Sequence, residues 1–308
     1  MTPDPAFGDG HTAWVGRSNW AGRVFGSVRP VSEVAALLGR VWRAEAEATA
    51  RVTRAMAQFA GTDAVASRPL GDGVLVALGP GRYVNRAIGV GPDLDDADLD
   101  AVEEFFASRG LPPSVQLSSW VSEQTLARMS SRGYRPQWFR SVFARALPIP
   151  DPPTRANDID GRDRIGIVAV GDEELDVWLD VLAEGNEVAT AEGRVISDEF
   201  GRGAHRAVGS ADFLAIIDGR AVGCGSLQVV SDVALLGGAA TQPAHRGRGV
   251  QSALLRHRVR RATELGCNVV AATAVSAGAS ARNLLRHGLR LVDTQLVMTA
   301  EPDDGLAT

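Results

Sequence analysis

A glycine-containing turn between an apolar segment and a helical segment constrains this chain of 308 residues more than any other feature. The apolar run 233–240 predicts a buried strand, and the stretch 250–262 predicts a helix because its apolar side chains recur at i, i+4 and i+7. Between them, Gly247 and Gly249 let the backbone turn tightly. A turn of this kind offers unpaired N–H groups and the positive end of a helix dipole, so the segment suits a pyrophosphate.

Three phosphate-binding patterns compete for this turn. The P-loop requires a lysine, and the chain contains none. The dinucleotide-binding pattern requires a third glycine where this chain has Ser252. The segment resembles the acetyl-CoA-binding motif of the GNAT acyltransferase superfamily, R-x-x-G-x-G/A, through Arg246 and Gly249. Gln251 departs from the Gly or Ala of that family, and a simple strand-to-helix turn with solvated arginines is the alternative interpretation.

A second segment strengthens the resemblance. A strand predicted at 268–273 is followed by a helix with Ser280 and Asn283, and Gly288 suits a left-handed helix end. The resemblance implies that the opening between the two strands admits the pantetheine arm of acetyl-CoA. It also implies the following CoA-binding residues: Ala239, Ala240, Thr241, Arg246, Gly247, Arg248, Gly249, Val250, Gln251, Ser252, Ser276, Ser280, Asn283 and Arg286.

The first half of the chain repeats the order of predicted elements found in the second. Aligning Gly133 with Gly288 places Leu94, in an Asp-rich helix start, opposite Gly249. Carboxylates at a helix N-terminus repel a phosphate, so we expect no CoA site there. We therefore predict an α/β (α+β) chain of two tandem GNAT-like domains, each a mixed, mostly antiparallel sheet flanked by helices. The predicted boundaries are a degenerate copy at 1–150, a linker at 151–162, an acyltransferase domain at 163–300 and a disordered tail at 301–308.

The groups that move protons in the family are poorly represented. The strand 233–241 has no ionisable side chain where many relatives have Glu, and Leu284 stands where many have Tyr. Our candidates are Glu187 as base and Ser280 as acid. A solvated carboxylate and a helix-capping serine are the alternatives. Further candidates are Glu184, Glu192, Ser276 and His287.

Composition excludes several other functions. A net charge of −5 disfavours a general nucleic-acid surface, although some relatives take aminoacyl-tRNA. The arginines at 256–261, and Glu45 and Arg51 on a helix predicted from Ser32 to Phe59, are expected on solvated faces. Histidines are scattered without metal-ligand spacing, so no metal is expected.

Two cysteines and the sequence of the N-terminus bear on the cellular compartment. Cys224 and Cys267 lie in apolar runs, as buried free thiols of a reducing compartment do. No signal peptide is visible and no apolar run approaches the length of a membrane span. We expect a soluble, cytoplasmic monomer or homodimer that has no membrane partner.

The resemblance implies an acetyl-CoA- or acyl-CoA-dependent N-acyltransferase. It would acetylate a primary amine of a small molecule by direct attack on the thioester in a ternary complex. The alternatives are a non-catalytic acyl-CoA sensor and an aminoacyl-tRNA-dependent transferase of the same fold.

Overall fold

The computed structural model describes residues 31–60, 64–148 and 165–300. The predicted linker at 151–162 and the tail at 301–308 lie outside these residues, as does the N-terminal segment before residue 31. From Leu37 onward the described chain forms one compact unit, and residues 31–36 are described only as the start of a helix.

The first half supplies five strands and three helices of the described chain. The strands are β1 (Val65–Leu70), β2 (Gly73–Leu78), β3 (Arg86–Ile88), β4 (Ser114–Ser118) and β5 (Tyr134–Ala146). The helices are α2 (Val31–Ala60), α3 (Asp96–Ala107) and α4 (Glu123–Ser131).

The second half supplies six more strands. They are β6 (Gly166–Ala169), β7 (Ser210–Ile217), β8 (Arg220–Val230), β9 (Val233–Thr241), β10 (Val269–Ala274) and β11 (Arg290–Ala300). The helices are α5 (Leu175–Gly185), α6 (Ala191–Arg206), α7 (Val250–Glu264) and α8 (Ala279–Arg286), with a short 3₁₀ turn η2 (Pro243–His245).

All eleven of these strands lie in one sheet, in the order β1-β2-β3-β4-β11-β5-β10-β9-β8-β7-β6. Only β3 with β4 and β9 with β10 pair in parallel. The predicted fold class, α/β with mixed and mostly antiparallel strands, is confirmed. The two halves do not have a separate sheet each, however, because β5 pairs with β10 of the second half while β11 pairs with β4 of the first. The last strand of each half therefore pairs with a strand of the other half.

Local signals explain most of the elements. Ser122 accepts a hydrogen bond from the Thr125 N–H and so begins α4, and Asp95 with Asp98 forms a capping box that begins α3. The strand β1 was not expected, because Arg68 and Pro69 interrupt its apolar pattern. Its position at the edge of the sheet accommodates the proline, which cannot donate a ladder hydrogen bond.

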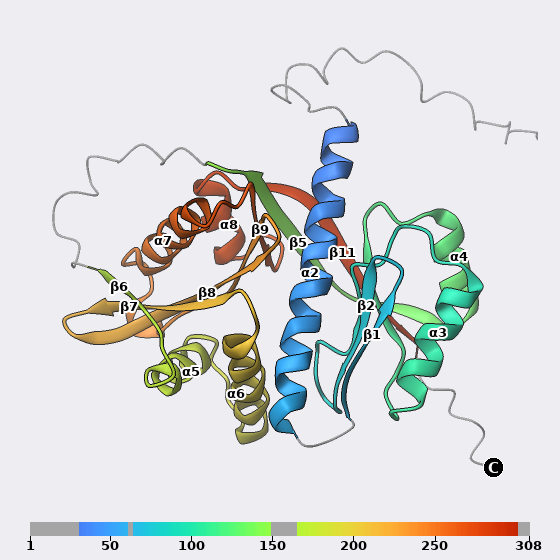
Figure 1. The fold of residues 1–308 in the computed structure, drawn as a ribbon, viewed down its shortest axis with the longest axis horizontal. Coiled ribbons are helices and arrows are strands. Elements are labelled where there is room, and N and C mark those ends of the chain that lie inside the picture. Colours follow the sequence, from blue (N-terminus) through green and yellow to red (C-terminus); the bar gives the residue numbers. More distant parts are fainter. Residues whose placement is uncertain (1–30, 61–63, 149–164, 301–308) are drawn as a thin grey trace, which may run out of the picture. The chain divides into compact units, whose positions relative to one another are not determined.

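Helices cover both faces of the sheet (Figure 1). Figure 1 shows α5 and α6 on one side of β7 and β8, and α7 and α8 on the other. The part of α2 from Leu37 onward packs on the face of α5 and α6, where Val41, Ala44 and Ala48 contact Val233 and Ala271 in one apolar cluster. Residues of α2 therefore cover the region where strands of the two halves meet.

Candidate functional site

The turn between β9 and α7 has the geometry of an anion site. Gly247 and Gly249 have φ of 79° and 86°, which only glycine adopts without strain. The first hydrogen bond of α7 runs from the Ala253 N–H to the Gly249 carbonyl at 3.0 Å, so the amides before Ala253 have no partner within the helix. A Cβ at Gly247 would meet no atom within 4 Å, so the space at the turn is open.

The two arginines of the turn contact protein groups. Arg246 donates to the Gly185 carbonyl at 2.9 Å and pairs with Glu187 at 3.1 Å. Arg248 lies 3.1 Å from Nδ1 of His245. The predicted base Glu187 thus lies two residues after α5 and is the ion partner of Arg246, with its side chain 66% exposed.

Gln251, the residue that departs from the family motif, holds the end of β9. Its Nε2 donates to the Ala240 carbonyl at 2.6 Å and lies 2.9 Å from Oγ1 of Thr241. The longer side chain thus fixes the first turn of α7 to the two strand residues that we expect to contact the pantetheine arm. Ala239, the third of these strand residues, is exposed.

The predicted CoA-binding residues of α8, the helix that follows β10, lie near the first turn of α7. Ser252 of α7 donates to Oδ1 of Asn283 at 3.1 Å, and Arg286 donates to the same oxygen at 3.3 Å. Ser276 is paired with Ser141 of β5, their hydroxyl oxygens being 2.7 Å apart. Ser280 is exposed in the first turn of α8. The structure therefore joins the first turn of α7 to α8 through Ser252 and Asn283.

Between these helix ends, β9 and β10 diverge. Their parallel pairing ends at Leu236 and Ala272, and β9 then bulges against β8. Arg258 occupies this bulge, and its Nη1 donates to the Ser226 carbonyl at 3.0 Å and to the Gly237 carbonyl at 3.1 Å. Gly225 makes room for it, because a Cβ there would lie 2.7 Å from the guanidinium carbon.

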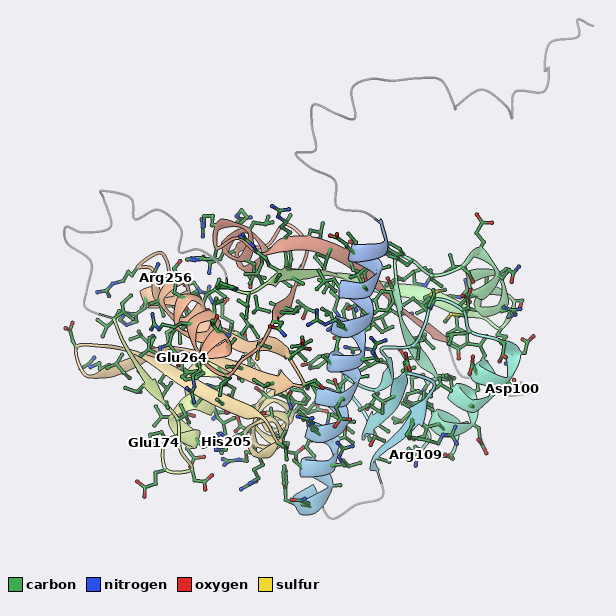
Figure 2. The ribbon with its side chains drawn as sticks, turned by 45° about the horizontal axis from the view of Figure 1, so that its top comes forward. Asp100, Arg109, Glu174, His205, Arg256 and Glu264 are labelled. Atoms are coloured by element: carbon green, nitrogen blue, oxygen red, sulfur yellow. The ribbon has the colours of Figure 1, made fainter. Side chains whose placement is uncertain are left out.

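Arg258 corrects the expectation of a fully solvated arginine face. It is 3% exposed, and burial lowers the pKa of its guanidinium to about 10. Its neighbours Arg256, Arg260 and Arg261 are exposed as expected, and Arg256 is labelled on α7 in Figure 2. Sequence spacing could have separated Arg258 from the others, because it lies one turn after the buried Leu254.

A cavity of about 210 Å³ lies where β9 and β10 diverge, on the face covered by α2, α5 and α6. Gly237 and Gly238 of the bulge, together with Thr273 of β10, form part of its wall. Trp178 of α5 also lines it, and the indole Nε1 of this buried residue has no hydrogen-bond partner in the part of the chain that the structure describes.

Glu45 of α2 is a cavity residue that the sequence analysis placed on a solvated face. Its side chain is 15% exposed and forms an ion pair with Arg140 of β5. Its Oε2 accepts hydrogen bonds from Gln116 at 3.3 Å and from Gln295 at 3.2 Å. Arg51, expected on the same solvated face, is also largely covered, at 22% side-chain exposure. The signal for Glu45 was its spacing of four residues from Val41, which is buried.

Comparison with known proteins agrees with this geometry. Residues 181–289 match the acetyltransferase (GNAT) family, a range that contains β9, the glycine turn, α7, β10 and α8. The chain carries a GNAT domain. No curated protein matches the sequence of the chain.

Solved structures match the GNAT domain together with the first half. A GCN5-related N-acetyltransferase from Kribbella flavida is 16% identical, with a TM-score of 0.56 over 82% of this chain and 95% of that one. One from Sphaerobacter thermophilus is 21% identical, with a TM-score of 0.52 over 86% of this chain and 96% of that one. A tandem GNAT protein from the clavulanic acid biosynthesis pathway is 17% identical, with a TM-score of 0.50 over 76% and 75%. These likenesses show the fold.

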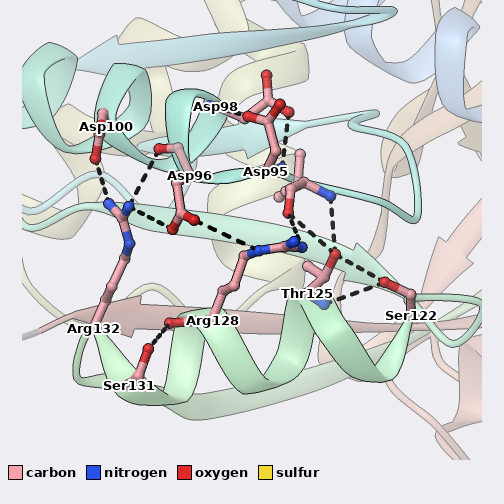
Figure 3. A network of polar contacts seen from close by, with 10 residues as sticks. Asp95, Asp96, Asp98, Asp100, Ser122, Thr125, Arg128, Ser131 and Arg132 are labelled. Atoms are coloured by element: carbon pink, nitrogen blue, oxygen red, sulfur yellow. Dashed lines mark hydrogen bonds and ion pairs between the residues drawn. The ribbon is translucent and has the colours of Figure 1, made fainter.

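The first half differs from the GNAT domain at the corresponding helix ends. There, the Ser122 N–H donates to the Pro92 carbonyl at 3.1 Å, and the Leu94 N–H donates to Oγ1 of Thr125 at 2.9 Å. Arg132 then joins Asp96 of α3 at 2.8 Å, and Figure 3 shows this network of polar contacts between α3 and α4. Direct hydrogen bonds thus tie the start of α4 to the segment before α3, whereas the corresponding residue of α8, Ser280, is exposed.

In the described residues, no three His, Cys, Asp or Glu side chains are grouped so that they could hold a metal ion. No described helix combines the length and hydropathy needed to cross a membrane.

Proposed function

We propose that this protein is an acetyl-CoA-dependent N-acetyltransferase that acetylates a primary amine of a small molecule. The observation that carries the proposal is the succession of three features along β9 and the turn that follows it. They are the amides of the α7 N-terminus that have no partner within the helix, the end of the β9–β10 pairing at Leu236 and Ala272, and the cavity lined by Gly237 and Gly238. With the pyrophosphate of CoA bound at the turn and an amine bound in the cavity, the thioester and the amine would meet at Gly237 and Gly238.

The residues present fit CoA. The amides from residue 247 to 252 would take the pyrophosphate, because the space beside Gly247 is open and the helix dipole favours negative charge. The backbone at 239–241 and the side chain of Asn283 would border the pantetheine arm. The bound thioester supplies the acetyl group, and Arg246 and Arg248 supply positive charge beside the turn.

The surroundings of the cavity favour direct transfer to the amine in a ternary complex. Cys224 is the nearest thiol to the bulge, and burial raises its pKa to about 12. A thiol that stays protonated is a poor nucleophile, so we assign no acyl-enzyme step to it. Glu187 and Ser280 remain our candidates for proton transfer, and Glu187 would have to leave Arg246 to act as a base.

Calorimetric titration with acetyl-CoA tests the proposal. We expect one site per chain, abolished or weakened about tenfold or more in Gly247→Asp, because a carboxylate in the turn repels the pyrophosphate. Gly266→Asp is a matched control, since Gly266 has φ of 77° and equally open surroundings but lies after the other end of α7. Unchanged binding by Gly247→Asp would refute the assignment of the turn.

Release of free CoA in the presence of amines then separates an enzyme from a sensor. Binding of acetyl-CoA without turnover of any amine would favour the sensor alternative. We also propose a cytoplasmic location, which is supported by two cysteines that remain buried free thiols.

A further inference from the structure

Positive charge is concentrated in the segment of the chain that contains α7 and α8. Residues 246–290 include nine arginines and one acidic residue, Glu264. The whole chain has 32 basic and 37 acidic residues, so the remainder of the chain is acidic on balance. The overall net charge of −5 is therefore the sum of a positive segment and a negative remainder.

Five arginines of this segment are exposed and form no ion pair with a carboxylate in the part of the chain that the structure describes. Two of them donate to oxygens nearby in the sequence, Arg282 to the Ala277 carbonyl at 2.6 Å and Arg286 to Oδ1 of Asn283 at 3.3 Å. The five are Arg256 and Arg260 of α7, Arg282 and Arg286 of α8, and Arg290 at the start of β11. Their charge is available to a partner.

Arginines on the opposite face of the sheet are paired differently. On α6, Arg194 forms ion pairs with Asp180 and Asp198, and Arg202 forms one with Asp176. An arginine that already has a carboxylate partner gains little from an added anion. The two helices α7 and α8 therefore offer the surface that an anionic partner would select.

Contacts between the two helices place these arginines on one surface. Ser252 of α7 donates to Oδ1 of Asn283, the same oxygen that accepts from Arg286. Figure 1 shows α7 and α8 on the same side of the sheet. Arg256 and Arg260 follow Ser252 at one and two helical turns, so they lie along the side of α7 that begins at this contact. We call the five exposed arginines together the α7–α8 surface.

The residues among these arginines favour a protein partner over a nucleic acid. Leu285 is 52% exposed and stands between Arg282 and Arg286 on α8. Arginine is enriched in protein–protein interfaces, where apolar contacts exclude water. Residues 246–290 contain no Phe, Tyr or Trp on which single-stranded bases could stack. An extended nucleic acid would also meet the acidic remainder of the chain.

We propose that the α7–α8 surface binds an acidic helical segment of a partner protein. Carboxylates one turn apart on such a helix have the same spacing as Arg256 and Arg260. Guanidinium and carboxylate groups form strong paired hydrogen bonds, and Leu285 adds an apolar contact. This inference goes beyond the acetylation of an amine and does not depend on it.

Binding of a labelled peptide, measured by fluorescence anisotropy, tests the proposal on the full chain. The probe is an alanine-rich helical peptide with glutamates one turn apart and one leucine, and its neutral counterpart has glutamines in their place. We expect the glutamate peptide alone to bind, with an affinity that falls as salt is added. In Arg256→Glu/Arg282→Glu the Kd should rise about tenfold or more, because like charges then face each other.

A second pair of charge reversals is the matched control. Arg43→Glu/Arg135→Glu changes the net charge by the same amount at exposed positions of α2 and β5. Peptide affinity should stay within about twofold of the wild type, because charges far from the surface are screened. Neither pair of variants contains a predicted CoA-binding residue. Acetyl-CoA affinity should therefore be unchanged in both, which also shows that they remain folded.

Three results would overturn the inference. The first is equal peptide affinity in the wild type and in Arg256→Glu/Arg282→Glu, or an equal loss in the control pair. The second is tighter binding of single-stranded RNA or of anionic phospholipid vesicles than of the glutamate peptide. The third is displacement of the peptide by CoA but not by dephospho-CoA, together with weaker CoA binding by Arg256→Glu/Arg282→Glu. That result would assign these arginines to the 3′-phosphate of CoA.

Discussion

Two buried side chains hold the backbone of the bulge from opposite faces. Arg258 of α7 donates to the Gly237 carbonyl, and the thiol of Cys224 donates to the next carbonyl, that of Gly238, at 3.3 Å. Because Gly237 and Gly238 both line the cavity, these two hydrogen bonds fix the segment where the thioester and the amine are expected to meet. Burial favours the neutral form of each group, lowering the pKa of Arg258 and raising that of Cys224.

The raised pKa of Cys224 predicts a loss of stability in alkali. The thiol titrates near 9.0 when exposed and near 12 in the folded chain. As the pH rises above 9 the unfolded chain releases this proton first, so the contribution is intact below pH 9 and is lost between pH 9 and about 12. From pH 8 to 10 the free energy of unfolding should fall about 1 kcal/mol more in the wild type than in Cys224→Ala. Urea denaturation at both pH values measures this, and parallel losses would contradict it.

At this scale the sequence predicted the backbone of the site better than its side chains. Gly247 and Gly249 were recognisable because a tight turn before a helix needs positive φ. Glu45 and Arg258 were misplaced because charged residues are usually exposed. Their burial depends on partners distant in sequence, such as Arg140 for Glu45 and the Gly237 carbonyl for Arg258.

At the scale of elements, the contrast between two helix pairs bears on the number of CoA sites. In the GNAT domain, α7 and α8 are joined through Ser252 and Asn283. In the first half, Thr125 of α4 is fully buried and binds the segment before α3. Ser280, its counterpart when Gly133 and Gly288 are aligned, is exposed. The start of α4 is therefore buried against the segment before α3, whereas the corresponding start of α8 is exposed to solvent.

We expect Thr125→Val to destabilise the protein by about 1–3 kcal/mol, because the Leu94 N–H loses its acceptor. It should not create a second CoA site, since the Asp96–Arg132 ion pair and the acidic start of α3 remain. Ser280→Val, at the exposed counterpart, should leave stability within about 0.5 kcal/mol of the wild type. Denaturation and calorimetric stoichiometry measure both effects, and two CoA sites in Thr125→Val would show that this closure alone had blocked the first half.

Most elements were predictable because their signals are local. Ser122 caps α4, and the hairpin of β7 and β8 turns at Asp218 and Gly219. The partner of each strand was not predictable. The apolar patterns of β5 and β11 predict strands, but they do not determine which strand each one pairs with, because that pairing depends on residues distant in the sequence.

At the scale of the whole molecule, the exchange of β5 and β11 joins the two halves. The strand β5 pairs with β10 at Ser141–Ala146, and β11 pairs with β4 at Gln295–Thr299. A buried polar network of Arg140, Gln116 and Gln295 runs through the same region and ends on Glu45 of α2. The cavity thus depends on residues from both halves of the sequence.

Fragments 1–156 and 157–308 should therefore assemble with each other. We expect an equimolar mixture to give a 1:1 complex with the cooperative melting of the intact chain, and each fragment alone to melt at a lower temperature. Size-exclusion chromatography and circular dichroism measure this. If the two fragments form no complex and each melts as in the intact chain, the exchange of strands is dispensable for stability.

The exchange also has a consequence for synthesis on the ribosome. Because β11 follows all the other described strands in the sequence and pairs beside β4, the sheet of the first half cannot be completed until β11 has been synthesised. Until then β4 presents an open edge, and such edges invite pairing with other chains. A nascent chain of this protein should thus depend on chaperones until β11 emerges, and a truncation that removes β11 would damage the half that was made first.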